Sequence, residues 1–74
     1  MKIVQVFKTD VQDRATATRI VHFLQLHFYD SRINFDLDDC DNILRVESRD
    51  TTITDIEIQS LITKCGHLCE PLQG

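Results

Sequence analysis

Hydrophobic and polar residues alternate along this chain with two different periods, and each change of period predicts a new element. Residues 2–8, KIVQVFK, form a short run rich in β-branched side chains, which predicts a strand. Residues 32–38, RINFDLD, alternate strictly between apolar and polar, as in a strand with one buried and one wet face. The turn DDCDN and a return strand at 43–48, ILRVES, follow, so these two strands predict a β-hairpin.

A helical period governs residues 10–30. An apolar stripe recurs there at i, i+4, i+7 and i+11, and it comprises Ala17, Val21, Leu24 and Phe28, with Ile20 at its edge. Asp10 is placed to cap the start of this helix, and Asp13 then falls in its first turn, where a negative charge is favourable.

A second helix is predicted to begin at Thr54. Thr54 and Glu57 have the spacing of a capping box, and Ile53 and Ile58 fit a hydrophobic staple around it. Gly66 has the character of a left-handed residue that ends a helix. The apolar face of this helix comprises Ile58, Leu61, Ile62 and Cys65. The tail HLCEPL contains a proline, which is typical of an edge strand.

The predicted order is therefore β-α-β-β-α-β within a single domain spanning residues 1–74. One sheet and two amphipathic helices are packed most simply with both helices on one sheet face. The sequence thus predicts an α/β (α+β) fold of the ferredoxin-like sandwich type, with an antiparallel four-stranded sheet. The polar positions of the second strand support this, because the other sheet face is too polar to be covered.

Composition narrows the possible functions. A hydrophobic share of 42% is enough for a core in a chain of 74 residues. The net charge of −4 and the scattering of the eight basic residues argue against nucleic-acid binding. The apolar start of the chain is too short for a signal core or a membrane span, so no membrane insertion is expected. Three cysteines, an odd number, do not suit a secreted disulfide framework and favour a reducing cytoplasm.

The element order, the strand KIVQVFK leading into a helix, the hairpin INFDLDDCDNILRVES and the terminal CGHLCEPL together resemble the heavy-metal-associated domain family. This family comprises small copper and zinc chaperone-like modules, and the resemblance spans nearly the whole chain. It implies the ferredoxin-like fold described above. The resemblance also implies a metal loop, Met-x-Cys-x-x-Cys, between the first strand and the first helix.

The residues of that metal loop are missing. The matching stretch is TDVQDR, in which Thr9 stands at the methionine position, Val11 at the first cysteine and Arg14 at the second. Two thiolates near a helix N-terminus bind soft metals, and neither is present. The resemblance therefore predicts a member of the fold with a degenerate metal site and no cofactor.

The segment CGHLC offers an alternative metal site made of Cys65, His67 and Cys69. Three observations argue against it: a thiol at a helix C-terminus meets the negative end of the dipole, structural zinc prefers four ligands, and the remaining cysteine lies in the hairpin turn. The alternative interpretation is structural. Cys65 is then the last core position of the second helix, His67 follows the cap glycine, and Cys69 is a small inward residue of the final strand. A reversible disulfide between Cys65 and Cys69 is the third possibility.

No sequence feature predicts catalysis. We find no glycine-rich phosphate loop, no paired catalytic carboxylates and no nucleophile near a base in the sequence. The expected function is therefore that of a small non-catalytic binding or interaction module, with metal handling through Cys65, His67 and Cys69 as the alternative.

Surfaces are the more promising feature. On the first helix, Phe23 and Leu26 lie away from the apolar stripe and next to Arg19. If Val4 and Val6 point to the core, the outward residues of the sheet include Ile3, Phe7 and Ile43. These residues predict an interface for a protein partner or for self-association through the sheet or the first helix, since a small domain gains stability by association.

Overall fold

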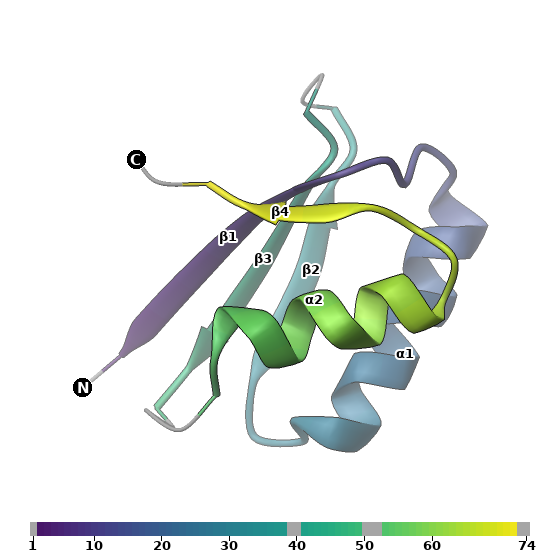
Figure 1. Ribbon diagram of the computed structural model, residues 1–74. Coiled ribbons are helices and arrows are strands. Elements are labelled where there is room, and N and C mark those ends of the chain that lie inside the picture. Colours follow the sequence, from purple (N-terminus) through teal and green to yellow (C-terminus); the bar gives the residue numbers. More distant parts are fainter. Residues whose placement is uncertain (1, 39–40, 50–52, 73–74) are drawn as a thin grey trace.

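The computed structural model describes residues 2–38, 41–49 and 53–72. It confirms an α+β fold with one antiparallel sheet of four strands and two helices (Figure 1). The elements in chain order are β1 (Ile3–Thr9), α1 (Arg14–His27), β2 (Arg32–Asp36), β3 (Ile43–Ser48), α2 (Asp55–Lys64) and β4 (Cys69–Pro71).

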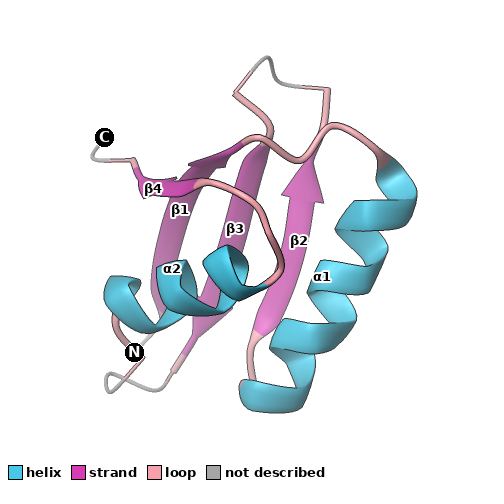
Figure 2. Ribbon diagram, turned by 45° about the vertical axis from the view of Figure 1, so that its right-hand side comes forward, coloured by secondary structure: helices cyan, strands magenta, loops and turns pink. Residues whose placement is uncertain are grey.

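The strands lie in the order β2-β3-β1-β4, and every neighbouring pair is antiparallel. The hairpin β2–β3 therefore forms one side of the sheet, and β1 inserts between β3 and the short β4. Both helices cover the same face of the sheet, as Figure 2 shows. As predicted, β4 is an edge strand, which tolerates Pro71 because an edge can spare a backbone donor.

The core lies between this inner face and the helices. Its fully buried side chains come from every layer: Phe7, Val11, Leu24, Leu44, Val46, Ile58 and Ile62. On α1 the most buried residues are Ala17, Ile20 and Leu24, whereas Val21 and Phe28 are only half-buried. The predicted stripe is therefore rotated slightly, and Ile20 lies at its centre instead of its edge.

The ends of α2 follow the sequence prediction. The Thr54 side chain accepts a hydrogen bond of 3.2 Å from the backbone N–H of Glu57. At the other end Gly66 has φ of +86°. The N–H of His67 bonds to the carbonyl of Ile62, and that of Gly66 bonds to the carbonyl of Thr63. These two bonds are those of a Schellman motif, which satisfies carbonyls that the end of a helix leaves free.

The start of α1 differs from the prediction. The N-cap is Asp13, not Asp10, and its carboxylate accepts 2.8 Å bonds from the backbone N–H and the hydroxyl of Thr16. Both aspartates have a side chain suited to capping, so composition could not decide between them. Asp10 has a different partner, which defines the candidate site below.

The orientation predicted for β1 is wrong. Residues opposite each other in an antiparallel pair project to the same face, and Phe7 lies opposite the fully buried Leu44. Phe7 is therefore a core residue with none of its surface exposed, and Ile3 shares its face and is half-buried. Val4, 48% exposed, and Val6 lie on the outer face, the sheet face turned away from both helices.

No helix within the described residues is long and apolar enough to span a membrane.

Candidate functional site

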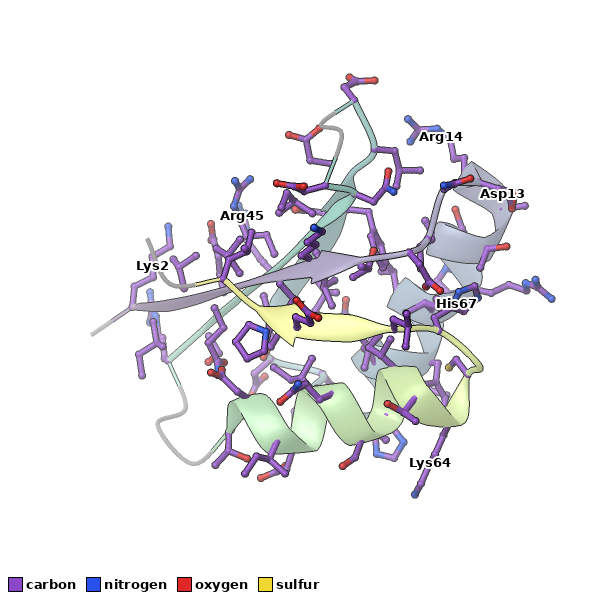
Figure 3. The ribbon with its side chains drawn as sticks, turned by 45° about the horizontal axis from the view of Figure 1, so that its top comes forward. Lys2, Asp13, Arg14, Arg45, Lys64 and His67 are labelled. Carbon is purple, nitrogen blue, oxygen red and sulfur yellow. The ribbon has the colours of Figure 1, made fainter. Side chains whose placement is uncertain are left out.

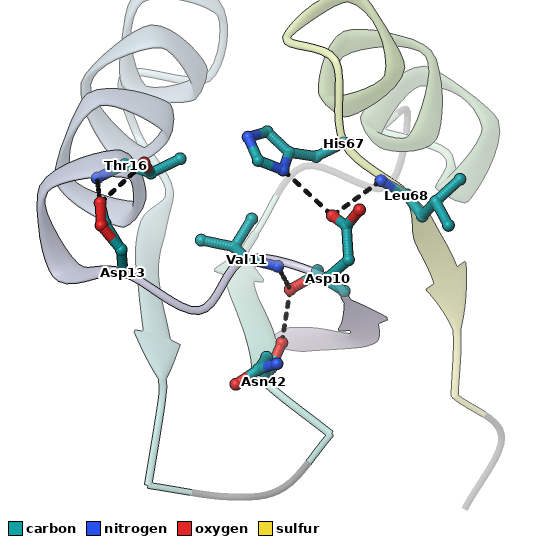
Figure 4. Close-up of polar contacts among 8 residues, drawn as sticks. Asp10, Val11, Asp13, Thr16, Asn42, His67 and Leu68 are labelled. Carbon is teal, nitrogen blue, oxygen red and sulfur yellow. Dashed lines mark hydrogen bonds and ion pairs between the residues drawn. The ribbon is translucent and has the colours of Figure 1, made fainter.

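Two loops that are far apart in the sequence meet at one corner of the molecule. They are the β1–α1 loop, residues 10–13, and the α2–β4 loop, residues 65–68. One oxygen of Asp10, Oδ1, accepts a 3.0 Å hydrogen bond from the backbone N–H of Leu68 and lies 3.1 Å from Nδ1 of His67 (Figure 4). The segment predicted as a degenerate metal loop and the segment predicted as an alternative metal site are thus parts of one corner.

The local backbone explains why His67 reaches Asp10. The left-handed Gly66 reverses the chain directly after α2, so the next residues run back toward the end of β1. At that end β4 pairs with β1, and Cys69 lies opposite Thr9. Asp10 follows Thr9 directly and therefore faces the residues that precede Cys69.

Thr9 and Val11 anchor the β1–α1 loop to the rest of the molecule. The hydroxyl of Thr9, which is buried, donates a 2.6 Å bond to the carbonyl of Asn42 and accepts a 3.2 Å bond from the N–H of Val11 (Figure 4). The N–H of Thr9 bonds to the carbonyl of Asp41. Val11 itself has no exposed surface and belongs to the core. The loop is consequently anchored both to the core and to the residues before β3.

The charges of the corner favour ionised aspartates. Partial desolvation raises the pKa of Asp10, but the hydrogen bond from Leu68 and the His67 ring together lower it by more. The pKa of Asp10 therefore lies below the usual 3.8. The pKa of Asp13 is lowered as well, mainly by the hydrogen bonds from Thr16. Both carboxylates are thus hydrogen-bond acceptors at neutral pH.

The three positions of the expected metal loop lie in different environments. Thr9 is buried and hydrogen-bonded, Val11 is buried in the core, and Arg14 is exposed as the first residue of α1. Figure 3 shows Asp13 and Arg14 at the same end of α1. A buried valine and an exposed arginine supply no metal ligand, and the capping carboxylate of Asp13 occupies the start of the helix.

The structure separates the members of the alternative metal site. Cys69 is buried on the inner face of β4, and burial, with the charges of Asp55 and Glu70, raises its pKa to about 12. Such a thiol is protonated at neutral pH and is a poor ligand. Cys65 is half-buried, and both Cys65 and Cys69 are free thiols, so no disulfide joins them. Cys40, the cysteine of the hairpin turn, lies outside the described residues.

Cys65 and His67 do share one feature. They line a small open hollow together with Thr16, Arg19 and Ile20 between α1 and the α2–β4 loop. Among the residues that the structure describes, however, no group of three or more His, Cys, Asp and Glu side chains is placed to hold a metal ion. The hollow therefore offers one thiol, one imidazole and one guanidinium.

The residues predicted as an interface are dispersed. Leu26 is 82% exposed and Arg19 is exposed, as predicted. Phe23 is instead half-buried, packs against the core and makes an edge-to-face contact with His27 at 5.0 Å between ring centroids. Ile43 lies on the outer face yet is only 7% exposed, flanked in its row by Lys8 and Asp36. With Ile3 and Phe7 on the inner face, the predicted apolar sheet patch is not formed.

The sequence did not predict the contact that Asp10 makes in this corner. It spans 57 positions and depends on the pairing of β4 with β1. Comparisons with protein-family models, with curated proteins and with solved structures find no match.

Proposed function

We propose that this chain is a small non-catalytic binding module of ferredoxin-like, heavy-metal-associated type, which acts through a protein surface and carries no metal. The proposal rests on the side chains at the β1–α1 corner. Where the family's two metal-binding thiols would stand, this chain has Val11, which is fully buried, and Arg14. The order of elements and the sheet order support the relationship to that family.

The remaining cysteines support a role without metal. Thiolates that bind soft metals are stabilised near helix N-termini or by cations. Here Cys65 lies at the C-terminal end of α2, and Cys69 is buried with its pKa raised. Free cysteines in these positions are in keeping with a reducing compartment such as the cytoplasm.

The non-catalytic part of the proposal rests on the same corner. Nδ1 of His67 is engaged with Asp10, and Cys65 and His67, both described residues, have no hydrogen bond between them in the shared hollow. A thiol nucleophile needs a base within hydrogen-bond reach. The corner instead ties two loops together, which is a structural task.

Native mass spectrometry of the reduced protein in the presence of zinc or copper(I) tests the proposal. We expect no stoichiometric complex at metal concentrations that saturate a two-thiol loop. The matched variant is Cys65→Ser, which removes the more accessible of the two described thiols. A one-to-one metal complex that disappears in Cys65→Ser would overturn the proposal and favour metal handling through Cys65 and His67.

A further inference from the structure

The outer face of the sheet separates its charges along the strands. Its side chains lie in rows set by the register, and the row of Arg32, Glu47 and Val4 is four residues from the row of Asp36, Ile43, Lys8 and Glu70. At the rise of a strand this distance is about 13 Å. The two rows therefore belong to opposite ends of the face.

The first end, which we term the basic end, carries three cations and one carboxylate: Lys2, Arg32, Arg49 and Glu47. Arg45 lies in the middle row, between Val6 and Asn34. Glu47 pairs with Lys2 at 3.2 Å, which leaves the two guanidinium groups of Arg32 and Arg49 at this end. Arg32 and Arg49 line the same open hollow as Lys2. Figure 3 shows Lys2 and Arg45 on the side of the sheet away from α2, whereas Lys64 projects from that helix.

The opposite end, the acidic end, carries four carboxylates and one cation: Asp36, Asp38, Asp41, Glu70 and Lys8. Lys8 approaches Asp41 at 3.8 Å and cannot neutralise the others. Between the two ends, Val6 and Leu72 lie side by side in the middle row, since the N–H of Leu72 bonds to the carbonyl of Val6. Leu72 is 40% exposed, and Val4, 48% exposed, adjoins this pair in the row of the basic end.

We propose that this face binds the same face of a second copy of the chain. A two-fold axis that lies midway between the two copies, parallel to their sheets and running across the strands, places the basic end of each copy on the acidic end of the other. Such an interface is self-complementary, as a two-fold dimer requires, and two sheets pack face to face at about 10 Å. Val6 and Leu72 of the two copies then meet in the middle.

Charge complementarity selects this partner. A uniformly acidic or basic protein would attract one end of the face and repel the other, whereas a second copy satisfies both ends. Because the face is largely charged and exposed, the dimer is weak and sensitive to salt: at 0.15 M the screening length is about 8 Å. The inference deepens the proposed interaction role and rests on it.

Charge-swap variants provide the test. Arg32→Glu with Arg49→Glu makes both ends of the face acidic, and Asp36→Lys with Glu70→Lys makes both ends basic. Sedimentation velocity should show the wild-type protein dimerising more strongly at 50 mM than at 500 mM salt. Each variant alone should be monomeric under both conditions. An equal mixture of the two variants should form a heterodimer at least as tight as the wild-type dimer.

The matched control reverses two cations on the helices, Arg19→Glu with Lys64→Glu, and has the same net charge as the acidic-face variant. It should dimerise like the wild type, and circular dichroism should show that all variants are folded. A wild-type monomer at high concentration and low salt, or a mixture that fails to associate, would overturn the inference. A protein that is monomeric and binds no metal would overturn this inference but not the proposed function. A protein that dimerises as described and also forms a metal complex would overturn only the proposed function.

Discussion

The side chains of Asp10 and His67 lie 57 positions apart in the sequence and meet at 3.1 Å in the structure. Through Oδ1, Asp10 also accepts the backbone N–H of Leu68, so one carboxylate oxygen joins the loop after β1 to the loop after α2. Because these loops lead into α1 and β4, the contact fixes both elements at the same end of the sheet. It is a tertiary contact between two residues for which the sequence predicted unrelated roles, a helix cap for Asp10 and a candidate metal ligand for His67.

Replacing Asp10 by asparagine should lower the free energy of unfolding at pH 7 by about 0.5–1 kcal/mol, as expected for a partly exposed charge-assisted bond. The pKa of Asp10 is lowered in the folded state, so its contribution is present above pH 3.8 and is lost as pH falls through the folded pKa. The difference between wild type and variant should therefore shrink from pH 7 to pH 3. Urea unfolding at both values measures it.

The control for this prediction is Asp30→Asn, which removes an exposed carboxylate of the same type. It should change stability little at either pH. An Asp10→Asn variant whose stability deficit is the same at pH 3 as at pH 7 would show that the carboxylate charge is unimportant to the corner.

Gly66→Ala should destabilise the protein by about 1 kcal/mol, the cost of placing a β-carbon in the left-handed region. An added β-carbon would meet nothing within 4 Å, so the cost comes from the backbone conformation and not from a clash. Gly66→Asn is the matched variant, because asparagine tolerates this conformation better, and it should lose less. Thermal unfolding of the two variants measures the difference, and equal losses would contradict this account.

Alkylation should distinguish the two described cysteines. Cys69 is 8% exposed and its pKa is raised to about 12, whereas Cys65 is half-buried beside an open hollow. At pH 8 iodoacetamide should therefore modify Cys65 many times faster than Cys69 in the native protein, because only the thiolate reacts. Tandem mass spectrometry of the peptide that contains both residues measures the rates. In denaturant the two rates should converge, and equal rates in the native protein would contradict the burial of Cys69.

The sequence predicted the element order and most element ends because those depend on local patterns. The cap at Thr54, the left-handed Gly66 and the alternation of β2 are each encoded within a few residues. The cap of α1 was misplaced because two aspartates, at 10 and 13, suit the role equally. Asp10 instead contacts His67 and Leu68, and the local sequence does not reveal these distant partners.

The orientation of β1 and the candidate site could not be predicted, since both depend on long-range partners. On polarity alone, Val4 and Val6 belong inside and Gln5 outside. The structure reverses this because Phe7 is needed in the core and because Gln5 finds a partner on α2. The meeting of Asp10 with His67 likewise exists only once β4 pairs with β1.

Gln5 provides the most direct test of that reversed strand. Its side-chain N–H donates to Oδ1 of Asp55 at 2.7 Å, while its own Oε1 is buried and has no hydrogen-bond partner among the described residues. Gln5→Glu keeps the shape but replaces the donor by a second carboxylate facing Asp55. At pH 7 we expect a loss of about 1–3 kcal/mol in the free energy of unfolding. The repulsion is removed when either carboxylate takes up a proton, so the loss should shrink as pH falls. Gln12→Glu, an exposed change of the same charge, is the control and should be nearly neutral. Urea unfolding at pH 7 and pH 4 measures both variants, and a Gln5→Glu protein as stable as Gln12→Glu would mean that position 5 faces solvent, as the sequence pattern alone suggested.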